Sequence, residues 1–339
     1  MPNTARAAIA ASTVLHVFDK LFSRFQWPSI LSALIIAALV WLWRRHAEPQ
    51  RTPGLCRFLF PREIWLHRSA LLDLRFVLFD KTALALLVGI GALFVVPKHI
   101  DAVAKGSGWI AHNGAHASLG IVIAYTFVLL LVEDFFRYWA HRWMHESPFL
   151  WQFHKVHHSS EVLIPLSQLR DHPVNGLVDL TRGALAVPLV TGAFLLVFPG
   201  KLTALSILGV NAGRFVFDIA GAQLRHSHVW ISFGAVFERI VVSPAQHQIH
   251  HSRDPVHYNS NYGSQLAIWD WLFGTLRVAG KHEELQFGID ARDTERMLTV
   301  RAMYWVPCVD AWGIAKRWWQ RRRAGSSGRR GDGPRANPV

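Results

Sequence analysis

The chain has almost no cysteine: Cys56 and Cys308 are the two in its 339 residues. This scarcity argues against a disulfide framework and against a zinc or iron–sulfur site built from thiolates. The sequence also lacks the Glu-x-x-His pair of ferritin-like di-iron bundles and the glycine-rich fingerprint of a dinucleotide-binding domain. We therefore expect any metal site to use other ligands, and any electrons to come from a separate protein.

Acidic residues are also scarce. The chain has 23 Asp and Glu and 36 Lys and Arg, which gives a formal net charge of +13. A basic chain can indicate nucleic-acid binding, and the segment 316–323 has that composition. Its tryptophans, and the apolar stretches nearby, instead favour contact with anionic lipid headgroups. We expect a membrane partner and no nucleic acid.

Long apolar blocks make up much of the chain, which is 51% hydrophobic. They predict membrane-spanning helices at residues 27–43, 76–96, 119–132, 183–198 and 202–220. The first block begins too late, and lacks the small-residue site, for a cleaved signal peptide. The alternative is buried helices of a soluble protein, since several blocks are shorter than about 20 residues.

The sidedness of the basic residues predicts an orientation. Between the first two expected spans lie Arg44, Arg45, Arg51, Arg57, Arg62, Arg68 and Arg75. Between the second and third spans we find Lys98 and Lys105, so the arginine-rich loop should be cytoplasmic. We therefore expect an integral protein of a bacterial inner membrane, with its active site and C-terminus in the cytoplasm.

Histidines fall into three clusters with spacings of one, three and four residues. The clusters are His141-x-x-x-His145, His154-x-x-His157-His158 and His247-x-x-His250-His251. Residues three or four apart share a helix face, so each cluster can direct several imidazoles at one point. Eight imidazoles exceed the four ligands of a closed structural zinc site and predict two metal ions. The alternative is histidines that only satisfy polar contacts near a membrane.

From about Leu131 to Thr275 the sequence resembles the fatty acid hydroxylase and sterol desaturase superfamily of integral-membrane di-iron enzymes. Besides the clusters, the resemblance lies in Asp134-Phe-Phe-Arg137-Tyr138-Trp139, Arg170-Asp-His172-Pro173, His226-Ser-His228-Val229, Asn261-Tyr262-Gly263 and Trp269-Asp270. It implies that the eight clustered histidines bind two irons, with His172 and His226 as further ligands. His228 stands where the family usually has asparagine, so ligation and a role beside the metals or at a substrate gate both stay open. Asn175 stands where an acidic residue is expected.

Asp134 is a candidate for orienting one of the ligands. A ligating imidazole usually donates its second N–H to a carboxylate or carbonyl. Asp134 precedes His141 by one helical heptad and so lies on nearly the same face. The alternative is a salt bridge from Asp134 to Arg137 or Arg142.

The expected fold is all-α: a multi-span membrane helix bundle with a cytoplasmic, histidine-rich di-metal helical cap. The expected units are N-terminal spans with a basic loop (1–118), a catalytic domain (119–280), an amphipathic basic segment (281–323) and a disordered tail (324–339).

The resemblance implies an oxidoreductase that uses O2 and external electrons to hydroxylate or desaturate a fatty acyl, sterol-like or sphingolipid-like substrate. Its cofactor would be two iron ions, for which zinc can substitute in a purified protein without redox chemistry. The donor would be a ferredoxin or a cytochrome b5-like protein with its reductase. Two alternatives remain: a non-catalytic histidine cage, and a metal-dependent lipid hydrolase.

Overall fold

This computed structural model describes residues 27–80, 82–83, 118–198 and 216–328. Within these ranges the chain is helical, and its β structure is limited to two isolated bridges, Val241 with Leu266 and Ser252 with Phe287. The all-α prediction is confirmed. The expected spans 76–96 and 202–220 lie largely outside the described residues.

Serine caps and prolines set where several helices begin. Ser118, Ser147 and Ser243 each accept a hydrogen bond from a backbone N–H of the helix that follows, while Pro148 and Pro244 occupy the first helical turn. The elements are α2 (Trp27–Ala47), α3 (Leu55–Leu59), α4 (Arg62–Trp65), α6 (Leu119–Glu146), α7 (Pro148–His158), η2 (Pro165–Leu169), α8 (Pro173–Val197), η3 (Ala222–His226), α10 (Gly234–Phe237), α11 (Pro244–His250), η4 (Pro255–His257), α12 (Ile268–Leu272), α13 (Ala291–Arg296) and α14 (Val300–Gly328).

Three helices are long and apolar enough to cross a bilayer: Trp27–Ala47, Leu119–Glu146 and Pro173–Phe194. They correspond to the first, third and fourth expected spans. The fourth differs in its start, because the helix begins at Pro173 rather than Gly183. Together with the long apolar blocks, these helices mark an integral membrane protein.

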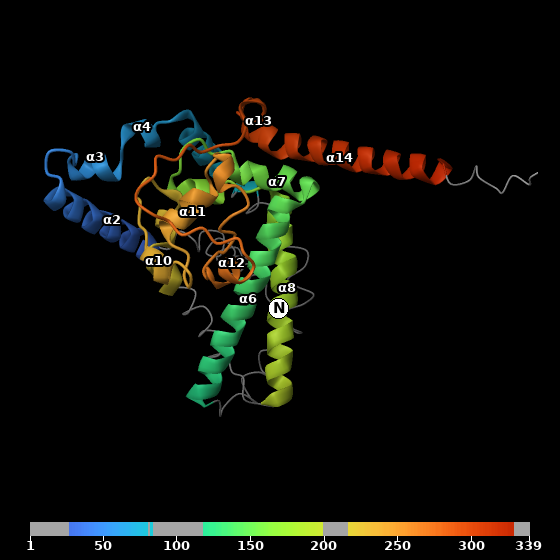
Figure 1. Cartoon of the computed structure of the whole chain (residues 1–339), viewed down its shortest axis with the longest axis horizontal. Coiled ribbons are helices and arrows are strands. Elements are labelled where there is room, and N and C mark those ends of the chain that lie inside the picture. The colour runs from blue at the N-terminus through green and yellow to red at the C-terminus, as the bar shows by residue number, and fades with distance from the viewer. Residues whose placement is uncertain (1–26, 81, 84–117, 199–215, 329–339) are drawn as a thin grey trace, which may run out of the picture.

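Helices α6 and α8 form a long antiparallel pair that extends from the rest of the molecule (Figure 1). Tyr125 joins them, since its hydroxyl lies 2.9 Å from Thr191 Oγ1 and its ring meets Phe194 edge-on. The chain leaves α6 and enters α8 at the same end of this pair, where α7 lies, and α12 lies beside the middle of α6 (Figure 1).

Helix α14 lies crosswise to the α6–α8 pair and projects sideways from the body (Figure 1). Its N-terminal part packs through Met303 against Phe76, Val156 and Met297, which makes a core between the N-terminal region and α7. The helix continues to Gly328, into the segment expected as a tail from residue 324. Residues 329–339 lie outside the described ranges.

Candidate metal centre

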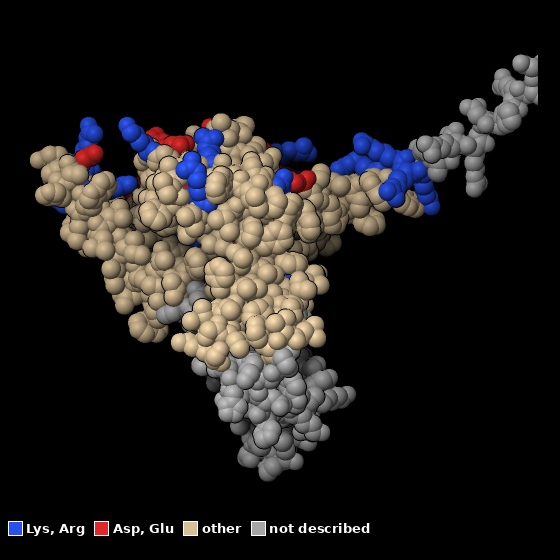
Figure 2. Space-filling view, turned by 60° about the horizontal axis from the view of Figure 1, so that its bottom comes forward, with Lys and Arg blue, Asp and Glu red and all other residues tan. Residues whose placement is uncertain are grey.

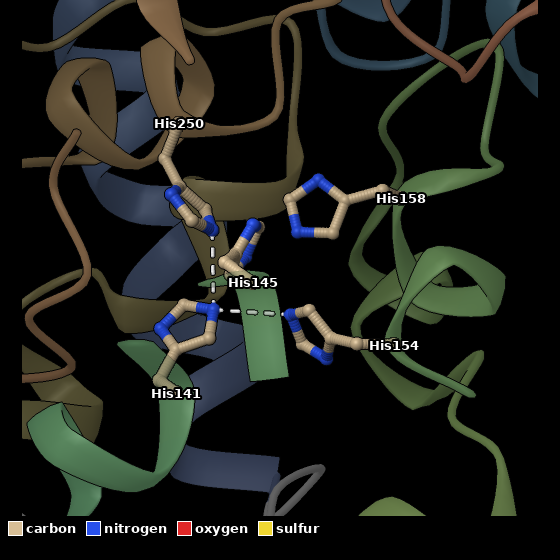
Figure 3. A group of neighbouring side chains, drawn as sticks. All are labelled: His141, His145, His154, His158 and His250. Atoms are coloured by element: carbon tan, nitrogen blue, oxygen red, sulfur yellow. Dashed lines mark hydrogen bonds between the residues drawn. The ribbon is translucent and has the colours of Figure 1, made fainter. Parts of the chain in front are cut away.

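Nine histidines form two adjacent groups in which the candidate ligand nitrogens lie within 4.8 Å of one another. The first group is His141, His145, His154, His158 and His250, drawn in Figure 3. The second group is His157, His226, His247 and His251. All eight clustered histidines and His226 are therefore brought together, from stretches far apart in the sequence.

Helical spacing explains how each cluster serves both groups. On α7, His154 and His158 are four residues apart and turn toward the first group, whereas His157 turns toward the second. The last cluster is divided the other way, because His247 and His251 share one face and His250 points to the first group. Helices α7 and α11 thus each contribute to two sites.

The ring nitrogens stand at distances that suit a shared metal ion. His141 Nε2 lies 3.1 Å from the Nε2 atoms of both His154 and His250 (Figure 3). In the second group, His247 Nε2 lies 2.9 Å from His226 Nε2 and 3.2 Å from His251 Nε2. With metal–nitrogen bonds of about 2.1 Å, ligands at right angles stand roughly 3.0 Å apart. The observed spacing fits that geometry.

Backbone carbonyls fix the orientation of several of these rings. His141 Nδ1 lies 2.7 Å from Tyr262 O, His250 Nδ1 2.9 Å from Ser260 O, and His157 Nδ1 3.3 Å from Arg170 O. Since a carbonyl can only accept, each Nδ1 carries the proton and donates it outward. The Nε2 lone pair then faces the centre of its group, as a metal ligand requires.

His226 is held in a similar way by a side chain. Its Nδ1 lies 2.9 Å from the hydroxyl of Ser167, which itself donates to Ile164 O at 2.8 Å. Because that hydroxyl proton is already used, Ser167 Oγ accepts from the ring. His226 therefore also presents Nε2 to its group.

Buried nitrogens without a partner support a bound cation. His145 Nε2 and His158 Nε2 are inaccessible and lack a hydrogen-bond partner among the described residues. Leaving a polar atom so buried costs free energy, which an ion in the first group would recover. A donor set made wholly of imidazole suits iron, copper, nickel or zinc. The residues present therefore fit a metal centre.

Burial keeps these histidines in their neutral form. It lowers the pKa of His154, His158, His250 and His251 well below the usual value of 6.5, and neighbouring imidazoles lower it further. A protonated ring cannot bind a metal. The site is therefore ready to ligate at neutral pH.

Two other predicted site residues, His172 and His228, lie outside both groups. His172 accepts from Val174 N as the cap of α8, and its Nε2 lies 3.1 Å from Tyr304 O. His228 Nε2 lies 2.6 Å from Phe58 O. Both ring nitrogens of His172 are thus engaged elsewhere, and His228 links η3 to the α3 region.

Asp134 binds the 265–269 segment rather than a ligand ring. Its carboxylate accepts from Gln265 N at 3.1 Å, Leu266 N at 3.0 Å and Trp269 Nε1 at 3.1 Å. None of these bonds, which are its described ones, reaches a histidine, because the side chain meets the 265–269 segment two helical turns before His141. The alternative salt bridge to Arg137 or Arg142 is absent among the described residues, where Arg142 pairs with Glu146 at 2.8 Å.

The segment that supplies the carbonyl of Tyr262 is held by Asp270. The Asp270 carboxylate accepts from Tyr262 N at 2.8 Å and from Gly263 N at 2.7 Å. A Cβ on Gly263 would lie 2.6 Å from Leu266 O, so only glycine fits this approach. The motif Asn261-Tyr262-Gly263 indicates a turn. The sequence could not predict the acceptor for His141, because every residue has a backbone carbonyl and the residue type does not mark the one that is used.

We expect Asp270→Ala to weaken metal binding about 10- to 100-fold, as is typical when a group that orients a ligand is removed. The reason is that Tyr262 O would no longer be fixed opposite His141 Nδ1. The measurement is metal retention against a chelator. Asp290→Ala is the matched control, because Asp290 also accepts from a backbone N–H but does so at the start of α13. Equal retention in both variants would contradict the assignment.

Comparison with known proteins gives one family and several relatives. Residues 126–275 match the fatty acid hydroxylase family. The chain is 27% identical over 283 residues to the ornithine lipid hydroxylase OlsE of Rhizobium tropici, covering 80% of each protein. It is 31% identical over 152 residues to the alkylglycerol monooxygenase of Danio rerio, which is 45% of this chain and 30% of that one.

A third relative is a putative Delta(7)-sterol-C5(6)-desaturase 2 of Arabidopsis thaliana, 28% identical over 167 residues, or 48% of this chain and 52% of the relative. The chain thus spans most of the hydroxylase from Rhizobium, about half of the relative from Arabidopsis and less than a third of the monooxygenase from Danio rerio. No solved structure matches.

Proposed function

Because the chain belongs to the fatty acid hydroxylase and sterol desaturase superfamily, we propose that it is a membrane-bound di-iron oxygenase that hydroxylates or desaturates a lipid. It is an oxidoreductase, like its relatives that are named hydroxylases and monooxygenases. The observation that carries the proposal is the division of nine histidines into two adjacent groups with metal-ligand spacing.

Each histidine group would hold one ion. His141, His145, His154, His158 and His250 would bind the first, and His157, His226, His247 and His251 the second. Two irons would supply the redox chemistry with O2 that zinc lacks. The protein's own part is to fix the rings through the carbonyls of Arg170, Ser260 and Tyr262 and to keep them neutral by burial.

A lipid is the substrate that this placement favours. The two groups lie at the end of the α6–α8 pair, next to helices long enough to cross a bilayer, so the substrate would be an apolar chain that reaches them from the bilayer. The relative from Rhizobium tropici, of which this chain covers 80%, is named for ornithine lipid. An acylated amino-acid lipid is therefore the first substrate to test, ahead of free fatty acyl, sterol-like and sphingolipid-like compounds.

The remaining parts of the proposal concern partners and location. Electrons would come from a ferredoxin or a cytochrome b5-like protein, in keeping with the absence of a dinucleotide fingerprint from the sequence. The catalytic domain would lie within 119–280. Its active site would face the cytoplasm across a bacterial inner membrane, which the arginine-rich loop between the first two spans supports.

The test uses the purified, iron-loaded protein with a reductant, a suitable donor and a lipid panel that includes ornithine lipids, under isotopically heavy O2. We expect a product that gains one heavy oxygen atom, or one that loses two hydrogens, by mass spectrometry. The non-catalytic cage would instead consume no O2 with any lipid. A hydrolase would cleave lipid equally well without O2. Either result would overturn the proposed function.

A further inference from the structure

Helix α14 is only half supported by the rest of the protein. Met303, Pro307 and Ala311 are buried, but from Trp312 to Arg323 none of the described side chains is buried. This part projects away from the body (Figure 1). An isolated helix of that length is marginal in water, so contact with another medium would stabilise this part of the 29-residue helix.

A stripe of large apolar side chains runs along one face of α14. Trp305, Val309, Trp312 and Trp319 are 68%, 47%, 71% and 51% exposed. Their spacings of four, three and seven place them on the same side, opposite the buried residues. Tryptophan is enriched at the boundary between headgroups and acyl chains. The stripe therefore has the chemistry of a face that lies on a membrane.

Positive charge is concentrated on the projecting part of α14. The projecting part carries Lys316, Arg317, Arg321, Arg322 and Arg323, and Figure 2 shows Lys and Arg gathered along it. The guanidinium of Arg322 lies 4.0 Å from the centre of the Trp318 ring, and that of Arg323 lies 3.6 Å from that of Trp319. The one acidic residue of α14, Asp310, is already paired with Lys155 and Arg296. The excess charge suits anionic phosphate headgroups.

The direction of α14 agrees with such a contact. The helix lies crosswise to the α6–α8 pair, at the end of the pair where the metal groups are (Figure 1). When that pair crosses a bilayer, α14 runs along the bilayer surface. We propose that α14 is an in-plane helix that docks its tryptophan stripe on an anionic lipid surface, in the same leaflet as the metal centre.

Docking of α14 would also fix the distance of the metal centre from the membrane surface. Lys155, which lies between two ligands on α7, binds Asp310 of α14 at 2.8 Å and Asp293 of α13 at 2.5 Å. Its side chain is 3% exposed, so this contact is buried. Helix α14 thus connects the lipid surface to the helix that carries His154, His157 and His158. This inference rests on the membrane-spanning helices and not on the oxygenase activity.

The test places a nitroxide label on the full-length protein in lipid nanodiscs, after Cys56→Ser and Cys308→Ser remove the native thiols. One label is attached at Trp312→Cys in the stripe, and its matched control at Arg321→Cys on the opposite face of the same helix. In nanodiscs with phosphatidylglycerol, we expect dissolved O2 to accelerate the spin relaxation of the label at 312, because O2 concentrates in the apolar part of a bilayer. The label at 321 should respond to a water-soluble nickel complex.

Removing charge gives the second arm. In the 312-labelled protein, Lys316→Gln and Arg323→Gln, which lie four residues after Trp312 and Trp319 on the stripe side, should each weaken docking about fivefold, so that the label becomes accessible to the nickel complex. Equal access of nickel to both labels in anionic nanodiscs would overturn the proposal. The proposal would also be overturned if the label at 312 were protected only after an acidic donor protein is added. A third contrary result is spin–spin broadening that does not depend on lipid, because it would show that a second copy of the chain covers the stripe. None of these measurements depends on lipid oxidation. Failure of the docking proposal can therefore be distinguished from failure of the proposed function.

Discussion

His158→Ala is expected to abolish lipid oxidation and to lower bound iron from about two ions to about one per chain. His158 belongs to the first group, where its buried Nε2 has no other partner among the described residues. Loss of one imidazole leaves a site with fewer nitrogens and a water-sized gap, while the second group keeps its full set. The measurements are metal content by mass spectrometry and turnover by product analysis.

His251→Ala should give the complementary result, because His251 belongs to the second group. The two variants should therefore lose different ions, which the iron spectra of the two half-loaded proteins would distinguish. His282→Ala is the control, since that exposed ring contacts Trp230 and lies in neither group. Full iron content in both cluster variants, with normal spectra, would show that these rings are not ligands.

The sequence was sufficient to predict that the histidines converge but not how they divide. Spacings of three and four residues place rings on one helix face, and this holds for His154 with His158 and for His247 with His251. The intermediate residue in each cluster serves the other group. That division depends on how α7 and α11 face each other, which is a matter of tertiary packing and has no signature in either segment.

Positions that depend on hydrogen bonding were harder to predict. His172 follows the family pattern, yet it caps α8 and approaches Tyr304 O. The start of α8 was missed for a related reason. The residues from Pro173 to Arg182 include polar side chains, so the apolar block begins only at Gly183, although the cap and Pro173 already begin the helix.

A further strong effect is expected at Asp73, in the helical segment 68–80 that precedes the family match. Asp73 binds the guanidinium of Arg170 at 2.5 Å, and both side chains are almost wholly buried, at 0% and 2% exposure. Arg170 also donates to Ser69 O at 2.8 Å and to Ser159 Oγ, just after α7. Asp73→Ala would leave a buried positive charge, which typically costs about 3–5 kcal/mol of unfolding free energy.

The consequence should reach the metal centre, because the carbonyl of Arg170 faces His157 Nδ1 at 3.3 Å. We therefore expect Asp73→Ala to lower the thermal unfolding midpoint in detergent and also to release iron from the second group before the first. Glu63→Ala is the control: its pair with Arg57 is exposed, so the midpoint should not change.

Charge and shape can be separated with a double variant. In Asp73→Leu/Arg170→Met the buried charge is absent from both partners, so much of the lost stability should return. The backbone carbonyl of residue 170 remains, and recovery of iron in the second group would show that its position, and not the ion pair itself, orients His157. If the double variant is no more stable than Asp73→Ala, then the cost lies in lost packing and the account of an uncompensated Arg170 charge is wrong.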